Sequence, residues 1–105
     1  MVKRAIEVML ANLDQTLLTA DLCQELGVSS RTLRYAFEEQ LGLSPMAYFK
    51  ARKLAAVRRQ LRLAAGDSVS VHVIARQWGF RHTGNFAADY RRLFGELPSE
   101  TLSKG

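Results

Sequence analysis

Two short stretches of this sequence carry side chains that can form paired hydrogen bonds with planar groups that present two adjacent polar atoms. In residues 30–35, Arg31 and Arg34 each offer a rigid fork of N–H donors, which matches two adjacent acceptors such as O6 and N7 of guanine. In residues 81–88, Asn85 offers an amide that can pair with the N6 and N7 edge of adenine. The same arginines also suit a phosphate, so the side chains alone leave both kinds of contact open.

No set of residues has the composition and spacing of a catalytic or metal site. The two histidines, His72 and His82, have no Cys, Asp or Glu at the spacing of a metal ligand. Glu38 and Glu39 are adjacent, so on a helix they point about 100° apart and cannot act as a catalytic pair. The seven glycines are scattered singly and form no phosphate-binding loop. The sequence therefore predicts no enzyme, no metal site and no cofactor.

The chain of 105 residues is long enough for one domain with a modest core. Its 48% hydrophobic and 24% charged residues exclude wholesale disorder, and no run approaches the ~20 apolar residues of a membrane span. The N-terminus shows no signal peptide, and the single cysteine, Cys23, suits a reducing compartment. These features predict a cytoplasmic protein.

Positive charge is concentrated in the later part of the chain. Residues 1–44 carry four basic and six acidic side chains, whereas residues 45–105 carry eleven basic and four acidic ones. The stretch from Pro45 to Gly66 contains no acid, and its basic residues are Lys50, Arg52, Lys53, Arg58, Arg59 and Arg62. Such a cluster is typical either of a solvated surface or of a protein that binds a polyanion, and composition does not decide between them.

Apolar residues recur at helical spacing along almost the whole chain, and no sustained alternation predicts a strand. The fold class is therefore expected to be all-α. Thr19 is expected to cap the second helix, Ser29 or Ser30 the third, and Ser44 the long helix that starts at Pro45 and runs to about Ala65. The buried faces expected for the first, third and long helices are Val2, Ile6, Met9, Leu10 and Leu13; Leu33, Ala36, Phe37 and Leu41; and Met46, Phe49, Leu54, Val57 and Leu61.

An internal repeat is the most informative feature of the sequence. The aligned ranges are 22–28 with 74–80, displaced by 52 positions, and 37–45 with 90–98, displaced by 53. Each copy predicts a short helix, a turn opened by glycine, and a longer helix, which is the outline of a helix-turn-helix unit. Two copies in register predict a tandem helix-turn-helix domain.

The residues from Thr19 to Phe37, with Leu41-Gly-Leu-Ser-Pro-Met-Ala-Tyr48, resemble the first helix-turn-helix unit and linker of AraC/XylS-type transcription regulators. Arg76-Gln-Trp-Gly-Phe80 and Tyr90-Arg-Arg-Leu-Phe-Gly95, followed by Pro98, are similar to that family's C-terminal signature. The resemblance covers about residues 3–103. It implies the C-terminal DNA-binding domain of such a regulator, with about seven helices.

The resemblance also implies an organisation and a set of partners. The first helix-turn-helix unit would occupy residues 1–44, a linker helix residues 45–66, and the second unit residues 67–105, with the only plausible linker at Gly66–Ser68. The domain would bind double-stranded DNA sequence-specifically and regulate transcription, with RNA polymerase as a partner. An N-terminal effector or dimerisation domain, for which this chain has no room, usually precedes such domains. We therefore expect a fragment rather than a stand-alone member.

In each unit the second helix should present its first turns to base edges. The candidates for reading bases are Ser30, Arg31, Arg34, Tyr35, His82, Thr83, Asn85 and Ala88. The candidates for holding phosphates are Thr32, Arg52, Arg59, Arg81, Arg91 and Arg92. Gly84 stands where the family usually has a side chain that can face DNA, which weakens the case for sequence reading by the second unit.

The long helix sets the expected geometry of binding. From Pro45 to Ala65 it would be ~30 Å long, close to the ~34 Å of one turn of duplex, so the units could enter two successive major-groove segments. Arg52, Arg58, Arg59 and Arg62 are expected on the side of this helix opposite its apolar arc. A different class of function stays open at this point: a helical protein-interaction adaptor that binds no DNA.

Overall fold

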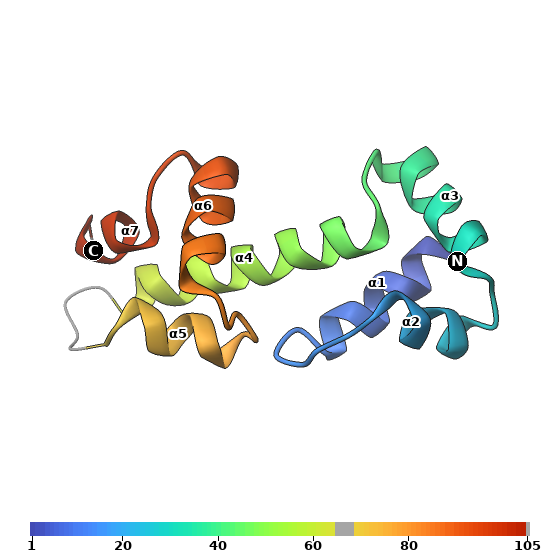
Figure 1. Cartoon of the computed structure of the whole chain (residues 1–105), viewed down its shortest axis with the longest axis horizontal. Coiled ribbons are helices and arrows are strands. Elements are labelled where there is room, and N and C mark those ends of the chain that lie inside the picture. Colours follow the sequence, from blue (N-terminus) through green and yellow to red (C-terminus); the bar gives the residue numbers. More distant parts are fainter. Residues whose placement is uncertain (65–68, 105) are drawn as a thin grey trace. The chain divides into compact units, whose positions relative to one another are not determined.

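Among residues 1–64 and 69–104, which the structure describes apart from the side chain of Thr83, the chain forms α-helices and no strand. The structure is a computed structural model, shown in Figure 1. Its helices are α1 (Val2–Ala11), α2 (Thr19–Leu26), α3 (Ser30–Leu41), α4 (Pro45–Leu63), α5 (Val71–Gln77), α6 (Thr83–Phe94) and α7 (Pro98–Lys104). The predicted all-α class and the predicted number of about seven helices are confirmed.

Serine side chains cap three of these helices. Ser29, Ser44 and Ser70 each accept, with Oγ, a hydrogen bond from the backbone N–H three residues further on, at 3.1, 3.2 and 3.1 Å. Each bond satisfies one of the N–H groups that the first turn of a helix leaves without a partner. The predicted cap at Ser44 is therefore confirmed, and of the two candidates Ser29 and Ser30 the cap is Ser29.

The predicted cap at Thr19 is wrong. Thr19 is the first residue of α2, and Leu18 occupies the capping position. The N–H of Leu18 donates to Oδ2 of Asp21 at 2.8 Å, so an acid in the first turn of the helix stabilises its start. A threonine before an apolar run resembles a cap in sequence. Here no side chain at the capping position accepts a hydrogen bond, and the helix start is held instead by the Asp21 carboxylate, which accepts from the backbone N–H of Leu18.

The same turn follows the first helix of each repeat. Gly27 and Gly79 have φ of 68° and 86°, in the left-handed region that favours glycine. The next residue then donates its N–H to the carbonyl five residues earlier, at 3.1 Å for Val28 and 3.0 Å for Phe80. The two copies seen in the sequence are therefore two copies of one backbone turn.

The chain divides into two compact units, Met1–Arg52 and Lys53–Gly105, which we call unit 1 and unit 2. Helix α4 contributes its first residues to unit 1 and the rest to unit 2. The predicted linker at Gly66–Ser68 and the predicted end of the long helix at Ala65 lie outside the described residues.

Unit 1 has its own hydrophobic core. The core residues are Val2, Ala5, Met9, Leu22, Leu33, Phe37 and Phe49, with Ile6, Leu13 and Met46 partly buried against them. Leu10 and Leu41 were expected in this core and are exposed. The buried stripe of α1 passes through Ala5 and Met9, so Leu10 lies about 100° away from it, and Leu41 is the last residue of its helix.

Unit 2 has a second core that follows the same plan. The core residues are Leu54, Val57, Leu61, Ile74, Ala75, Phe86 and Tyr90. The aromatic rings of Phe80, Phe86, Tyr90 and Phe94 pack in sequence, with centroids 4.7–5.9 Å apart. Ala75 has no exposed surface.

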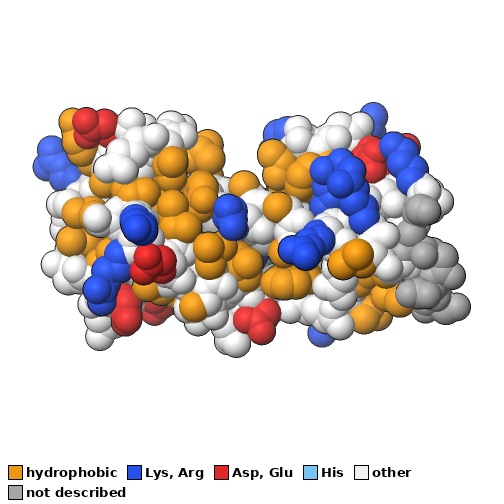
Figure 2. Space-filling view, turned by 180° about the vertical axis from the view of Figure 1, so that it is seen from behind, with side chains coloured by type: hydrophobic (Ala, Val, Ile, Leu, Met, Phe, Trp, Pro, Cys, Tyr) orange, Lys and Arg blue, Asp and Glu red, His pale blue; other side chains and the backbone are white. Residues whose placement is uncertain are grey.

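Hydrophobic and basic side chains lie side by side on the surface of each unit (Figure 2). Of the described helices, none is both long and apolar enough to cross a membrane.

Candidate nucleic-acid interface

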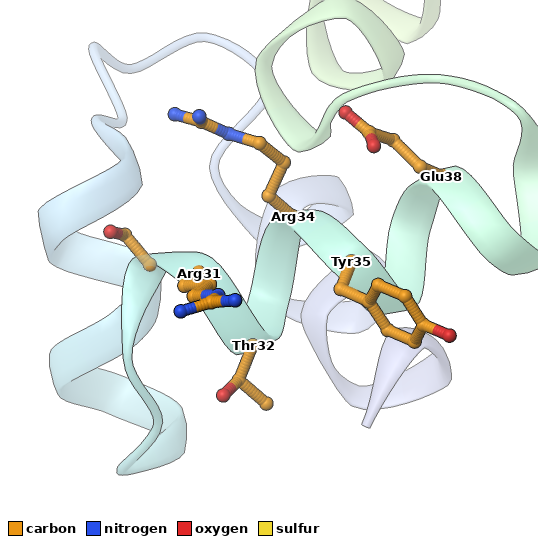
Figure 3. Close-up of a pocket in the computed structure, with 6 residues that line it drawn as sticks. Arg31, Thr32, Arg34, Tyr35 and Glu38 are labelled. Carbon is orange, nitrogen blue, oxygen red and sulfur yellow. The ribbon is translucent and has the colours of Figure 1, made fainter.

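Helix α3 exposes one polar face because its other face is locked into unit 1. Leu33 and Phe37 are fully buried, which fixes the rotation of the helix about its axis. The residues left outside line an open hollow of about 620 Å³ (Figure 3); they are Ser30, Arg31, Thr32, Arg34, Tyr35 and Glu38. The structure therefore brings together all four base-reading candidates of the first unit.

The side chains of this face leave α3 in two directions. Arg34 and Glu38, one turn apart, extend to one side of the helix, whereas Thr32 and Tyr35 extend to the other (Figure 3). Tyr35 is 68% exposed, so its ring and hydroxyl are both accessible from this face. The hydroxyl of Thr32 accepts a hydrogen bond from Ser29 at 2.9 Å, so it also helps to hold the start of the helix.

Glu38 is a member of this face that sequence reasoning missed. In the sequence it stands out only as half of an adjacent acidic pair, and in the structure it lies one turn after Arg34 on the same helix. A carboxylate here could accept a hydrogen bond from N4 of cytosine, and it would repel a nearby phosphate. The signal that could have found it was the spacing of four residues from Arg34.

Helix α6 is oriented in unit 2 in the same way. Phe86 and Tyr90 are buried, and the outward candidates Arg81, His82, Asn85 and Ala88 are exposed. The side chain of Thr83, also a candidate, lies outside the described residues. The outward faces of α3 and α6 therefore correspond in position.

The two outward faces differ in chemistry. With the displacement of 53, Gly84 corresponds to Arg31, and Ala88 corresponds to Tyr35. A Cβ placed on Gly84 would meet no atom within 4 Å, so the small residue leaves open space on the surface of the helix. The long hydrogen-bonding side chains of the first unit thus have small counterparts in the second.

The phosphate candidates are also exposed. Arg52, Arg59, Arg81, Arg91 and Arg92 all lie on the surface. Arg92 pairs with Asp89 at 3.3 Å, and its side chain remains 79% exposed. An ion pair this exposed holds the arginine weakly, which leaves it able to move to a stronger anion.

Two basic residues of α4 do not lie on an open basic face. Arg58, expected opposite the apolar arc, is half-buried, with its guanidinium carbon 4.9 Å from the centroid of the Phe94 ring. Lys53 is only 8% exposed. The expectation for Arg58 is wrong because this residue follows the buried Leu54 by four positions and so lies beside the apolar arc of α4, where its guanidinium packs on an aromatic ring of α6.

Lys53 belongs to a polar clamp that holds the turn of unit 2. Its Nζ donates to the carbonyl of Trp78 at 3.1 Å. Trp78 Nε1 donates to Gln60 at 2.8 Å, and Gln60 donates to Gln77 at 2.8 Å. Lys53 and Gln60 are two turns apart on α4 and both hold the end of α5. The clamp therefore fixes the backbone from which α6 starts.

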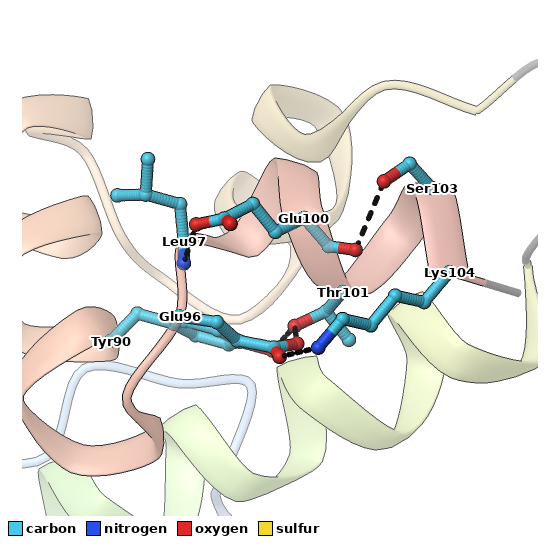
Figure 4. Close-up of polar contacts among 7 residues, drawn as sticks. All are labelled: Tyr90, Glu96, Leu97, Glu100, Thr101, Ser103 and Lys104. Carbon is cyan, nitrogen blue, oxygen red and sulfur yellow. Dashed lines mark hydrogen bonds and ion pairs between the residues drawn. The ribbon is translucent and has the colours of Figure 1, made fainter.

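A second polar network joins α6 to α7 (Figure 4). The buried hydroxyl of Tyr90 lies 2.7 Å from Oγ1 of Thr101. Thr101 donates to Glu96, and Glu96 also accepts a hydrogen bond from Lys104. The bonds from Lys104 and Thr101 lower the pKa of Glu96 below its ordinary value, whereas burial raises the pKa of Tyr90. The carboxylate of Glu96 is therefore the favoured state.

Within the part of the chain that the structure describes, no three His, Cys, Asp or Glu side chains are grouped to hold a metal ion.

These features define a class, the tandem helix-turn-helix proteins. In each unit the second helix of the helix-turn-helix, α3 or α6, buries one side in the core and exposes the opposite side to solvent. Comparisons with known proteins agree with this class. A family model described as "Helix-turn-helix domain" matches residues 22–104. The solved structure of a probable AraC family transcriptional regulator from Rhodopseudomonas palustris CGA009 is 36% identical, with a TM-score of 0.90 over 98% of this chain and 94% of that one. The chain belongs to the AraC-type helix-turn-helix family of DNA-binding transcription regulators.

Two curated relatives are longer than this chain. The "Probable thc operon regulatory protein" of Rhodococcus erythropolis is 38% identical over 101 residues, which cover 96% of this chain and 30% of that protein. The "XylDLEGF operon transcriptional activator 2" of Pseudomonas putida is 37% identical over 101 residues, covering 96% and 64%. The chain thus spans less than two thirds of the length of either relative.

Proposed function

We propose that α3 and α6 lie in two successive major-groove segments of one DNA site and read it sequence-specifically. The observation that carries this proposal is the outward face of α3, where hydrogen-bonding side chains surround one hollow at the start of a helix held rigidly by Leu33 and Phe37. The corresponding exposed face of α6 supports a second contact. This is the arrangement in which helix-turn-helix proteins place a recognition helix in the groove.

The two units have different proposed roles. In unit 1, Arg31 and Arg34 would pair with guanine, and Ser30 and Tyr35 would contact neighbouring base edges. In unit 2, Asn85 would pair with adenine and Ala88 would lie against a thymine methyl group, with His82 and Thr83 beside them. The proposed phosphate contacts come from Thr32, Arg52, Arg59, Arg81, Arg91 and Arg92. Unit 1 then supplies most of the discrimination between sequences.

The proposal for the whole protein reaches further than this chain. Both curated relatives are named as operon regulators, one of them as an activator, which supports a role at an operon promoter with RNA polymerase as a partner. The greater length of these relatives supports an N-terminal effector or dimerisation domain. The proposed role is binding without catalysis and without a cofactor, in the cytoplasm where a promoter is accessible.

Selection of binding sites from a randomised duplex pool, using the 105-residue chain, tests the proposal directly. We expect one enriched sequence, and binding to it that weakens about 10³-fold between 50 and 200 mM salt, as for a protein with about six phosphate contacts. The double variant Arg31→Ala with Arg34→Ala is the control. It should enrich no defined sequence in the part of the site that α3 is proposed to read. A pool that stays random, with no salt-dependent binding of any duplex, would favour the protein-interaction adaptor instead.

A further inference from the structure

Unit 2 carries two neighbouring hollows, and Arg59 is the one proposed DNA contact among the residues that line them. One, the polar hollow, has a volume of about 290 Å³ and is lined by Arg58, Arg62, Glu96, Thr101 and Lys104. The other, the apolar hollow, has a volume of about 260 Å³ and is lined by Ala55, Arg58, Arg59, Arg62, Leu63 and Phe94. Because Arg58 and Arg62 belong to both, the two hollows form one continuous surface.

The polar hollow is suited to a carboxylate. Three cations line it, and its one acid, Glu96, already accepts hydrogen bonds from Thr101 and Lys104. Nε of Arg58 is buried and has no hydrogen-bond acceptor among the described residues. The guanidinium groups of Arg58 and Arg62 both line the hollow, and a carboxylate is the acceptor that suits guanidinium best.

The apolar hollow is suited to a hydrophobic side chain. The Phe94 ring forms part of its wall and also lies under the Arg58 guanidinium, at 4.9 Å. Leu63, at the end of α4, is 75% exposed, which leaves a large apolar surface in water. Basic side chains gather around hydrophobic ones on this unit in the space-filling view (Figure 2). The surface thus combines positive charge with apolar area.

DNA fits this surface poorly. Phe94 follows Asn85 by nine residues, about two and a half turns, so the two lie on opposite sides of α6. The base-reading side of the helix is therefore turned away from the Arg58 guanidinium. A duplex backbone would also leave the exposed Leu63 without an apolar partner.

We propose that the two hollows are a docking site for an acidic segment of a partner protein. A carboxylate of the segment binds Arg58, Arg62 and Lys104, and an apolar side chain beside it packs on Phe94 and Leu63. The charge complementarity and the adjacent apolar wall determine this choice of partner. The inference does not depend on the proposed reading of DNA, since neither hollow includes a base-reading candidate.

An NMR titration of the isotope-labelled 105-residue chain, without DNA, tests the docking site. The probe is a short synthetic peptide of Asp, Glu, Leu and Phe, and the matched peptide has Asn and Gln in place of Asp and Glu. We expect saturable shifts of the amides of Arg58, Arg62, Leu63 and Phe94, with the neutral peptide binding about tenfold more weakly. Absence of binding, or shifts centred on α3 and the start of α6, would overturn the proposal.

Two exposed arginines of unit 2 provide a matched pair of variants. Arg62→Glu should weaken binding of the acidic peptide about tenfold or more, whereas Arg91→Glu, with the same change of charge, should leave it unchanged. If both variants bound the acidic peptide equally weakly, the peptide would be attracted by the overall positive charge of unit 2, and the proposal of a docking site at the two hollows would be wrong. Random duplex DNA that shifts the Arg58 and Leu63 amides as strongly would assign the surface to phosphate, and free succinate binding as tightly as the peptide would make it a small-anion pocket.

Discussion

Arg34 follows the buried Leu33 in α3, and this neighbour determines where its side chain can go. Because Leu33 is held in the core of unit 1, the side chain of Arg34 must leave the helix on the outer side, where it extends to the same side as Glu38 and away from Tyr35 (Figure 3). Glu38, one turn further on, lies on the same side and limits how closely a phosphate can approach. The local charge pattern therefore favours a base edge over a phosphate as the partner of Arg34.

We predict that Arg34→Ala weakens binding to the selected site by ~1–3 kcal/mol and relaxes the preference at one or two positions. Arg34→Lys is the matched control, because it keeps the charge and loses the planar fork. Lysine should restore affinity for random duplex without restoring the sequence preference. Quantitative binding to the selected site and to single-base variants of it measures both effects. Equal losses on selected and random duplex would mark Arg34 as a phosphate contact.

Glu96 predicts a specific dependence of stability on pH. Lys104 and Thr101 lower the pKa of this carboxyl below its ordinary 4.5 in the folded chain, and unfolding removes both partners. The stabilisation is therefore present above about pH 4.5 and is lost as the pH falls from there through the lower folded pKa. We expect the denaturation midpoint of the parent to fall more between about pH 5 and 3 than that of Glu96→Gln. Parallel pH profiles for the two proteins would contradict this.

At the scale of elements, the end of α5 is held by the polar clamp from α4. Trp78 is half-buried beside the core of unit 2, and its Nε1 donates to Gln60 at 2.8 Å. We predict that Trp78→Ala lowers the free energy of unfolding by ~3 kcal/mol, the low end for an aromatic residue, because part of the ring is already exposed. Trp78→Phe keeps most of the packing and loses the hydrogen bond, so it should cost ~1 kcal/mol. Denaturant titrations measure both, and an unchanged midpoint for Trp78→Ala would show that the clamp is absent.

The start of α6 contains a small, exposed residue, Gly84, that makes no packing contact through a side chain. Gly84 is helical, and a Cβ on it would meet no atom within 4 Å. Alanine should therefore stabilise the chain by ~0.5 kcal/mol, chiefly by restricting the unfolded state. Ala88→Gly, one turn further on and also exposed, is the control and should destabilise by a similar amount. Thermal melts measure both, and a less stable Gly84→Ala variant would mean that the backbone there is not helical.

The sequence predicted elements better than the course of long side chains. The caps at Ser29 and Ser44 and the turns at Gly27 and Gly79 depend on local chemistry, so a few neighbouring letters are enough to predict them. The inward path of Lys53 depends on a carbonyl 25 residues away, and that of Arg58 depends on a ring 36 residues away. Helical periodicity places only the Cβ of such residues. For α3, helical periodicity was enough to predict which residues face outward, because the buried Leu33 and Phe37 fix the rotation of the helix.

At the scale of the whole molecule, charge is divided between the two units. Unit 1 has six basic and six acidic residues, whereas unit 2 has nine basic and four acidic ones. Unit 2, which has small residues at Gly84 and Ala88, therefore carries the whole net charge of +5, and the neutral unit 1 has Arg31, Arg34 and Tyr35 on the outward face of α3. This division supports the proposal that unit 2 supplies most of the attraction to the duplex and unit 1 most of the discrimination between sequences.

The direct order of the two repeats predicts the form of the DNA site. The two units are direct repeats on a single chain, so we expect the bound site to be asymmetric and occupied by one chain. If α3 and α6 lie in successive major-groove segments, the chain should protect about two turns of duplex, roughly 20 base pairs. Hydroxyl-radical footprinting on the selected site, with a stoichiometric titration, measures both the length and the number of chains.

A double variant of α3 separates the two units within the same footprint. Arg31→Ala with Arg34→Ala should remove protection of one segment and leave protection of the other, because Asn85 and the basic residues of unit 2 remain. Removing Arg81 and Arg91 together should instead lower affinity for all duplexes and reduce the slope of the salt dependence by ~2. Protection of a single turn, or a palindromic footprint occupied by two chains, would contradict reading of two segments by one chain, even with DNA binding intact.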